Sequence, residues 1–320
     1  MNEMDELLKI LDLKKYHSLR QNFLFSRNKG DVRAVDGVTF SIFEGETLGL
    51  AGESGCGKST LGRTIVRLEE PDSGRIIYRG SDITHLRKND LKDFRKEVQM
   101  IFQDPLASLD PRMTVGNSIE EALIIHNMGD ESERKDVVHD LLLKVGLSAD
   151  LAGRYPHELS GGQQQRIGIA RALAVNPRLI VADEPVSALD VSVQAQILNL
   201  LSELKCELGF SFLFIAHNLW VIRYLSDRVA IMYLGKIVEL ADNNELFERP
   251  LHPYTIALLS SLPGKKNRMI LKGEVPSPVN PLAGCRFHPR CPKKFDICGR
   301  IEPELKEIRK GHFVMCHLYP

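Results

Sequence analysis

Residues 52–60 read Gly-Glu-Ser-Gly-Cys-Gly-Lys-Ser-Thr and match the P-loop pattern G-x-x-x-x-G-K-[ST] at every required position. The apolar residues 47–51 before this motif predict a short buried strand, and residues 61–68 after it predict a helix. The motif therefore lies in the strand–loop–helix context that phosphate binding requires. The alternative is a glycine-rich turn that matches by chance, and the Lys-Ser-Thr sequence at this position argues against it.

The glycines and the start of the helix explain how this loop would bind phosphate. Because glycine has no Cβ, the backbone N–H groups of the loop can approach an anion closely. The helix that begins near Lys58 adds roughly half a positive charge at its N-terminus. We expect Lys58 to reach the β- and γ-phosphates, Ser59 to ligate Mg²⁺ and Thr60 to support the α-phosphate side. The predicted nucleotide-binding residues of the loop are Gly52, Glu53, Ser54, Gly55, Cys56, Gly57, Lys58, Ser59 and Thr60.

Composition and charge narrow the class of protein. The 320 residues predict one large or two modest domains. Lys plus Arg and Asp plus Glu both number 42, so the chain lacks the basic excess that is usual in nucleic-acid-binding proteins. No apolar run approaches the roughly 18 residues of a membrane-spanning helix, and the acidic N-terminal residues do not resemble a signal peptide. We therefore expect a cytosolic protein, which would reach a membrane only by docking on a partner.

Periodicity and turn signals predict an α/β chain with a helical insertion. We expect irregular structure over residues 1–30 and a helical insertion over about residues 105–165. Strands are predicted at residues 32–42, 75–78, 98–102, 179–182 and 212–216, with an antiparallel hairpin at 229–233 and 236–240. Helices are predicted at residues 86–96, 113–125, 134–145, 193–208 and 254–262.

Polar side chains follow three of the predicted strands. Gln103 follows the first, Asp183 and Glu184 the second, and His217 the third. Because ligands of open parallel sheets bind outside the carboxyl ends of strands, we expect these groups to converge on one phosphate. Asp183 would hold Mg²⁺, and Glu184 would orient and deprotonate the attacking water. Taken alone, Gln103 and His217 are more often structural, and only the accompanying motifs favour Mg²⁺ ligation by Gln103.

A second anion-binding helix start is predicted at residues 157–166. Ser160 is a suitable N-cap, and Gly161 and Gly162 leave backbone N–H groups uncovered at the start of the helix. A lone Ser-Gly-Gly sequence would be a weak signal, whereas the full run through Gln163 is more specific.

The six cysteines are unevenly distributed. Cys56 and Cys206 stand alone, whereas the other four follow the spacing C-x5-C-x6-C-x17-C. In a reducing compartment such a cluster indicates a metal site rather than disulfides. Four thiolates suit an iron–sulfur cluster or zinc, although the C-x2-C pairs of common zinc sites are missing. Iron–sulfur, zinc and unliganded thiols all stay open. The four residues are Cys285, Cys291, Cys298 and Cys316.

The order of these motifs resembles that of ATP-binding cassette (ABC) ATPases over about residues 10–250. The resemblance is carried by the P-loop, Gln103, residues 159–163 (Leu-Ser-Gly-Gly-Gln), Asp183-Glu184, residues 187–190 (Ser-Ala-Leu-Asp) and His217. The run 159–163 separates this family from other P-loop NTPases. The resemblance implies a mixed-sheet core, an antiparallel β subdomain and a helical insertion.

The resemblance also implies that two cassettes close head to tail around ATP. Nucleotide would lie between the P-loop of one cassette and the signature residues of the other, which here are Ser160, Gly161, Gly162 and Gln163. Gln103 would mark the Q-loop that senses a transmembrane partner, and His217 the switch histidine at the γ-phosphate. The D-loop residues would be Ser187, Ala188, Leu189 and Asp190. Tyr16 is our choice for the aromatic residue that stacks on adenine, with His17 as the alternative.

The last 70 residues resemble the C-terminal extension of oligopeptide/dipeptide importer ATPases. Residues 252–255, 273–278 and 284–292 carry this resemblance, and residues 62–63 and 104–109 resemble the F-type subunit. The implied domains are an ABC ATPase at 1–250 and the extension at 251–320. The implied partners are a related but distinct D-type ATPase, two transmembrane permeases and, indirectly, an extracytoplasmic binding protein. In some relatives the four cysteines ligate a [4Fe–4S] cluster, which we expect here, with zinc as the alternative.

The predicted function is therefore ATP hydrolysis that energises an importer of di- or oligopeptides, with ATP and Mg²⁺ as cofactors. The same role in an importer of nickel or oligosaccharides is the alternative. A soluble ABC ATPase of DNA repair or translation is a more remote one, because such proteins usually carry a long coiled-coil insertion or two cassettes in one chain. This sequence has neither feature.

Overall fold

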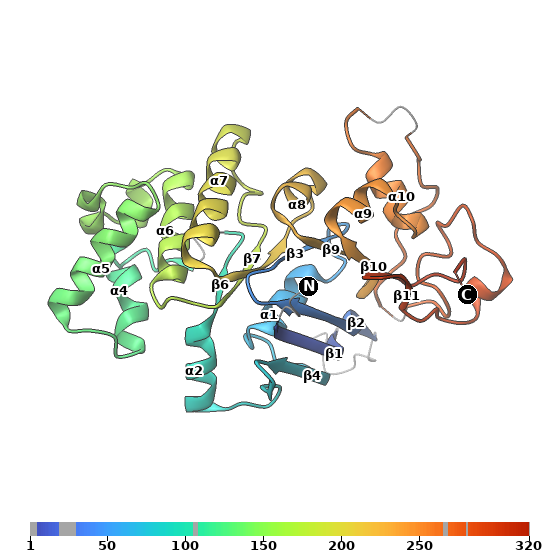
Figure 1. Cartoon of the computed structure of the whole chain (residues 1–320), viewed down its shortest axis with the longest axis horizontal. Helices are drawn as coiled ribbons and strands as arrows, with labels where there is room; N and C mark the ends of the chain where they lie inside the picture. The colour runs from blue at the N-terminus through green and yellow to red at the C-terminus, as the bar shows by residue number, and fades with distance from the viewer. Residues whose placement is uncertain (1–4, 19–29, 105–107, 265–267, 280, 320) are drawn as a thin grey trace, which may run out of the picture. The chain divides into compact units, whose positions relative to one another are not determined.

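The computed structural model describes residues 5–18, 30–104, 108–264, 268–279 and 281–319. The chain forms two compact units. Unit 1 consists of Met1–Thr84 and Ile215–Pro320, and unit 2 is His85–Phe214. The P-loop and the C-terminal cysteines thus belong to the same unit. Figure 1 colours both units along the chain.

An antiparallel sheet of unit 1 contains the first strand of the chain. Its order is β2 (Asp31–Phe43), β1 (Glu6–Ser18), β4 (Ser73–Tyr78) and β5 (Ser81–Asp82), and β1, β2 and β4 lie side by side in Figure 1. The expectation of irregular structure was wrong for residues 6–18. Strand β1 pairs with both β2 and β4 and buries Leu7, Leu8, Ile10 and Leu13, so its polar residues lie between the core positions. Residues 19–29 lie outside the described residues.

The second sheet of unit 1 leads into the P-loop. Strand β3 (Thr47–Ala51) pairs parallel with β9 (Arg228–Tyr233), which forms the predicted antiparallel hairpin with β10 (Lys236–Asp242). Strands β12 (His312–Val314) and β11 (Lys306–Arg309) extend this sheet beyond β10, so the C-terminal segment shares it with β3. The helices of unit 1 are α1 (Lys58–Ile65), α8 (Leu219–Leu225), α9 (Asn243–Glu248) and α10 (Pro253–Ser260), followed by the 3₁₀ turn η3 (Asp296–Gly299).

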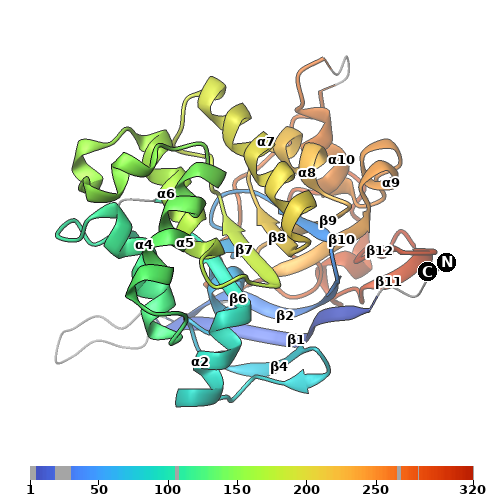
Figure 2. The ribbon, with the colours of Figure 1, turned by 60° about the vertical axis from the view of Figure 1, so that its left-hand side comes forward.

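Unit 2 combines parallel strands with a group of helices. Strand β6 (Val98–Ile101) pairs parallel with β7 (Leu179–Asp183), and β8 (Ser211–Ile215), whose last residue belongs to unit 1, lies next to β7. The helices are α2 (Lys88–Glu97), α4 (Val115–Ile125), α5 (Glu131–Lys144), α6 (Gly161–Leu173) and α7 (Val191–Leu208), with the 3₁₀ turns η1 (Ala149–Gly153) and η2 (Pro156–Glu158). Figure 2 shows α4, α5 and α6 packed together, and this group is the predicted helical insertion.

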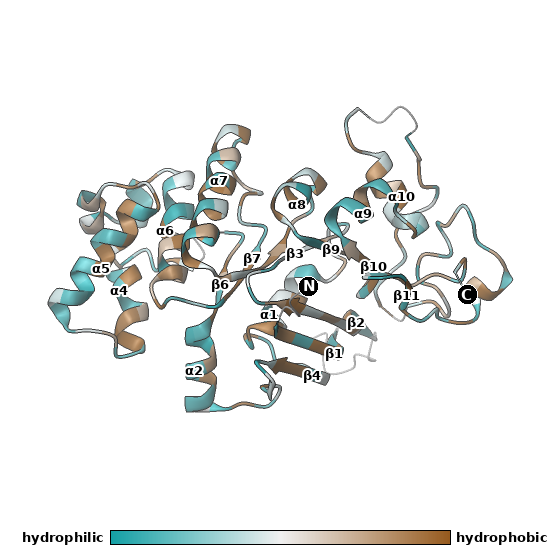
Figure 3. Ribbon diagram, in the orientation of Figure 1, coloured by the Kyte–Doolittle hydropathy of each residue, from teal (hydrophilic) through white to brown (hydrophobic). Residues whose placement is uncertain are grey.

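The helices of the insertion are capped, and each buries part of its surface. Asp130 and Glu133 form a capping box at the start of α5, and the buried side of this helix contains Val138, Leu141 and Leu142. In Figure 3, helix α5 carries both teal (hydrophilic) and brown (hydrophobic) residues. Burial of one face against α4 and α6 therefore stabilises α5. Among the described residues, no helix is both long and apolar enough to cross a membrane.

Candidate nucleotide-binding site and cysteine cluster

Two glycines bring the P-loop into close contact with neighbouring backbone. Gly57, the N-cap of α1, has φ +108°, and a Cβ at this position would lie 1.9 Å from the Ala34 carbonyl oxygen. A Cβ on Gly52 would lie 2.2 Å from the Met232 carbonyl oxygen. Any larger residue would therefore displace the loop from β2 or β9. These two contacts are the physical reason for glycine at both positions.

The Lys58 side chain is enclosed by the P-loop. Its Nζ donates hydrogen bonds to the carbonyl oxygens of Gly52 at 2.9 Å and Glu53 at 3.1 Å. The residue is only 4% exposed. The loop thus holds a cation within the turn that matches the phosphate-binding motif, next to the start of α1. This arrangement fits a phosphate ligand, because a fixed ammonium and a helix N-terminus both attract an anion.

Two residues of the C-terminal segment form hydrogen bonds to the P-loop, and the sequence alone did not predict these contacts. The Glu53 N–H donates to Tyr254 Oη at 3.0 Å, and the Glu53 carboxylate accepts two bonds from Arg290, at 2.9 and 3.1 Å. Arg290 also donates to Tyr233 Oη at 3.4 Å. Burial lowers the pKa of Arg290, but the bonds to Glu53 and Tyr233 outweigh it and raise the pKa above its usual value. Nothing in the local sequence signals these partners, which are more than 200 residues from Glu53.

Tyr16 is anchored by its hydroxyl group. Its Oη donates to Asp36 Oδ1 at 2.5 Å, and the guanidinium of Arg33 lies 5.6 Å from the ring centroid. Burial and this hydrogen bond raise the pKa of Tyr16 to about 12. Asp36 also accepts a bond from Arg286, which lies next to Cys285. Adenine stacking by Tyr16 stays a prediction. His17, its alternative, lies with Nε2 3.6 Å from a Glu69 carboxylate oxygen.

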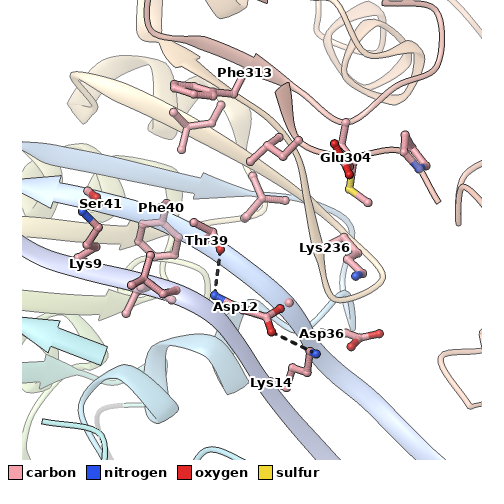
Figure 4. Close-up of a pocket in the computed structure, with 18 of the residues that line it drawn as sticks. Lys9, Asp12, Lys14, Asp36, Thr39, Phe40, Ser41, Lys236, Glu304 and Phe313 are labelled. Carbon is pink, nitrogen blue, oxygen red and sulfur yellow. Dashed lines mark hydrogen bonds and ion pairs between the residues drawn. The ribbon is translucent and has the colours of Figure 1, made fainter. Parts of the chain in front are cut away.

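A cavity of about 1030 Å³ borders Asp36 between β1, β2, β10 and the C-terminal segment (Figure 4). Asp12 and Lys14 face it from β1, and the Asp12 N–H bonds to Thr39 at 2.9 Å. Its lysines and arginines are each paired with an acidic residue, as in the Lys236–Glu302 pair at 2.7 Å. Because these charges are already paired, we assign no ligand to the cavity.

His217 follows strand β8 and lies two residues after the last residue of that strand. The preceding Ala216 donates its N–H to the carbonyl oxygen of Leu50 at 3.2 Å, one residue before the end of β3. The His217 side chain is exposed. Unit 1 therefore places this histidine at the sheet edge from which β3 runs into the P-loop.

Unit 2 brings three of the predicted residues together. Gln103 Nε2 lies 3.3 Å from Glu184 Oε2 and 3.4 Å from Ser187 Oγ, and Ser187 Oγ donates to the Glu184 carbonyl at 3.1 Å. Glu184 has φ +47°, a conformation that costs about 1–3 kcal/mol in a residue other than glycine. Asp183, at the end of β7, is 1% exposed.

The signature run begins a capped helix. Ser160 Oγ accepts from the Gln163 N–H at 3.4 Å, and the Gln163 side chain accepts from the Ser160 N–H at 2.9 Å, so the predicted N-cap is confirmed. A Cβ on Gly162 would lie 2.7 Å from Val193 Cγ1, and one on Gly161 would lie 3.5 Å from Leu189. The signature run and the predicted D-loop, 187–190, are thus neighbours within unit 2.

The four C-terminal cysteines line one small cavity, together with His252, His288 and His317. All four are free of disulfides. Burial raises the pKa of the Cys285 thiol to about 12, so a metal bound there would have to displace this proton. Among the described residues, no group of three or more Cys, His, Asp or Glu side chains is arranged to hold a metal ion. The shared cavity confirms that the cysteines cluster in space, whereas the iron–sulfur prediction still rests on the resemblance.

Two family patterns match this chain. The ABC transporter pattern matches residues 35–187, and the pattern described as the C-terminal region of oligopeptide/dipeptide transporters matches residues 238–298. The oligopeptide transport ATP-binding protein AppF of Bacillus subtilis (strain 168) is 56% identical over 323 residues, which cover 98% of both chains.

Solved ABC proteins share the fold. The ATP-binding cassette MJ0796, in a dimeric post-hydrolysis state with ADP and Pi, aligns with a TM-score of 0.66 at 30% identity. The alignment covers 74% of this chain and 99% of that chain. The protein cbiO1 from Clostridium perfringens, part of the ABC transporter complex cbiONQ, aligns with a TM-score of 0.65 at 27% identity, covering 77% and 92%. The predicted fold class is therefore confirmed.

Proposed function

Because this chain belongs to the ABC transporter family and resembles oligopeptide transport ATP-binding proteins along its whole length, we propose that it hydrolyses ATP to energise peptide import. The observation that carries the proposal is the P-loop, in which Lys58 Nζ lies inside a glycine turn at the start of α1. The match of residues 238–298 to the C-terminal region of oligopeptide/dipeptide transporters supports peptides as the cargo class.

We propose the following roles at the nucleotide. Lys58 binds the β- and γ-phosphates, Glu184 orients and deprotonates the attacking water, and His217 stabilises the transition state at the γ-phosphate. The hydroxyl, amide and carboxylate oxygens of Ser59, Gln103 and Asp183 are hard ligands of the kind Mg²⁺ prefers. Mg²⁺ would offset the charge that develops on the phosphate oxygens. The contact of Gln103 with Glu184 supports a shared function of these two residues.

The proposed assembly is a head-to-tail pair with a related but distinct ATPase, docked on two permeases at the cytoplasmic face of the membrane. The exposed, glycine-rich start of α6 supports a role in binding a partner's nucleotide. Ile124 and Ile125, at the end of α4, are 51% and 50% exposed, and such apolar side chains suit a protein contact on the helical insertion. The division into an ATPase domain at 1–250 and an extension at 251–320 stays part of this proposal.

We further propose that Cys285, Cys291, Cys298 and Cys316 ligate a [4Fe–4S] cluster, with zinc as the alternative. The four thiols line one cavity and are soft ligands of the kind that iron–sulfur clusters and zinc both take. Each of the four cysteines would supply one thiolate to the group. Anaerobic purification with counts of iron, sulfide and zinc tests this proposal. Stoichiometric zinc without sulfide would contradict the cluster. If neither iron nor zinc were found, the four cysteines would be unliganded thiols and both proposals would fail.

Transport assays test the proposed function. The chain should co-purify with two permeases and a second ATPase, and the complex in vesicles should import di- or oligopeptides only with ATP and a peptide-binding protein. The Lys58→Ala complex is the matched control and should neither bind ATP nor transport. Uptake of nickel or oligosaccharides without peptides would contradict the cargo class. Normal ATPase activity in the Lys58→Ala complex would contradict the site.

A further inference from the structure

Residue 53 of the P-loop is bonded through its backbone N–H, its carbonyl and its side chain. The N–H donates to Tyr254 Oη, and the carbonyl accepts from Lys58 Nζ at 3.1 Å. The carboxylate pairs with Arg290 in a two-point contact. Glu53 therefore connects the ammonium group of Lys58 directly to the C-terminal segment.

Arg290 is itself held in the cysteine-bearing turn. Backbone hydrogen bonds of 2.9 to 3.4 Å link Cys285 to His288, Phe287 to Arg290 and His288 to Cys291. Phe287, three residues before Arg290, is 1% exposed. Its ring centroid lies 5.3 Å from that of Tyr233 and 5.4 Å from that of Tyr254. The turn of residues 285–291, which carries two of the four cysteines, therefore fixes the position of the guanidinium against the loop.

The charges explain why this contact concerns nucleotide binding rather than stability alone. A buried ion pair often contributes little net stability, because desolvation offsets the attraction. The side chains of Arg290 and Glu53 are only 9% and 28% exposed. Without Arg290, an uncompensated carboxylate would stand on the loop that binds a polyanion, and like charges in a protein site repel. Arg290 keeps this carboxylate neutralised and turned toward the C-terminal segment.

We infer that Arg290 is a positioning residue for the P-loop, and that it makes ATP affinity depend on the integrity of the cysteine-bearing turn 285–291. The inference rests on the proposed binding of the ATP phosphates at the P-loop. Removal of Arg290 should weaken ATP binding more than ADP binding, because ATP brings more negative charge to Glu53. The effect should appear in KM rather than in kcat, because it removes ground-state binding.

A double-mutant cycle tests the coupling in the full-length chain with a fluorescent ATP analogue. Arg290→Gln should weaken binding about tenfold in the presence of Glu53, which corresponds to about 1.4 kcal/mol. In the Glu53→Gln background the same substitution should weaken binding less than about twofold, because the repelling carboxylate is gone. Equal losses in both backgrounds would overturn the inference.

Arg309→Gln is the matched control. Arg309 also lies in the C-terminal segment and pairs with a carboxylate at 2.6 Å, but its partner is Glu245 on α9 rather than the P-loop. This variant should bind ATP like the wild type. If it weakens binding as much as Arg290→Gln does, general destabilisation of the segment explains both results. If Lys58→Ala loses ATP binding while Arg290→Gln has no effect, this inference is contradicted but the proposed function is not.

The dependence on the turn has its own test. Cys291→Ser alters the turn next to Arg290 and should weaken ATP-analogue binding in the wild-type background, but add nothing further in the Arg290→Gln background. Thermal unfolding without nucleotide identifies any variant that has lost its fold, in which case Cys285→Ser replaces it. Additive losses would show that the cysteines affect the loop by another route and would overturn this part of the inference.

Discussion

The backbone N–H of Glu53 donates a hydrogen bond of 3.0 Å to the hydroxyl of Tyr254, although 201 residues separate the two along the chain. Tyr254 lies in the first turn of α10 and is fully buried, with its ring 4.6 Å from that of Tyr233. A residue outside the cassette motifs thus fixes the second residue of the P-loop. The C-terminal extension therefore supports the phosphate-binding loop directly.

Tyr254→Phe should destabilise the P-loop without disturbing the aromatic cluster. The ring stays packed against Tyr233 and Phe287, but the partly buried Glu53 N–H loses its acceptor, which costs about 1 kcal/mol. We expect lower stability in urea unfolding and weaker binding of ATP in fluorescence titrations. Tyr319→Phe is the control, because that hydroxyl bonds to the Leu251 carbonyl instead. Unchanged ATP affinity in Tyr254→Phe would show that this bond does not shape the loop.

Glu184→Gln should bind ATP but hydrolyse it roughly 10²-fold or more slowly, as expected for loss of a general base. The amide is nearly isosteric, so the strained backbone and the contact with Gln103 can persist. Phosphate release in single-turnover experiments measures the step. Glu207→Gln, which removes the exposed partner of Lys144, is the control and should retain full activity. Near-normal turnover in Glu184→Gln would refute the assigned role.

Gly57→Ala should strongly weaken nucleotide binding. The new Cβ would lie 1.9 Å from the Ala34 carbonyl oxygen, and φ +108° is strained for alanine, so the loop and the start of α1 must shift. Isothermal titration with ATP and Mg²⁺ measures the loss, which should exceed about tenfold. Gly168→Ala, at an open position within α6, should bind normally. Retained binding in Gly57→Ala would mean that the loop conformation described here is not the one that holds phosphate.

Tyr16 should contribute stability that is lost at alkaline pH. Burial and the bond to Asp36 raise its pKa from 10.0 to about 12 in the folded state. Its contribution is therefore complete below pH 10, where the phenol is neutral in both states, and is lost as pH rises from 10 to 12. Tyr16→Phe should show a shallower loss of unfolding free energy over this range in urea titrations. Identical slopes for the two proteins would contradict the raised pKa.

The local sequence pattern was enough to predict the elements around the P-loop. The spacing of apolar residues and the positions of glycines predict, to within a few residues, strand β3, the hairpin of β9 and β10, and helix α7. Strand β1 was missed because its buried residues are interrupted by lysines and an aspartate, and its partners β2 and β4 supply the hydrogen bonds that hold it extended. Pairing with distant strands overrode a weak local signal.

The sequence by itself determined the phosphate-binding motif, the capped signature helix and the positions of polar residues after the strands, because each depends on residues within one turn or one strand. Only the tertiary structure decided that Tyr254 and Arg290 hold Glu53, and that four cysteines spread over residues 285–316 line one cavity. The ion pair of Glu53 spans 237 residues. No short-range preference of the backbone encodes such a contact, since it arises from the packing of Tyr254 and Phe287 of the extension against each other and against Tyr233 of β9.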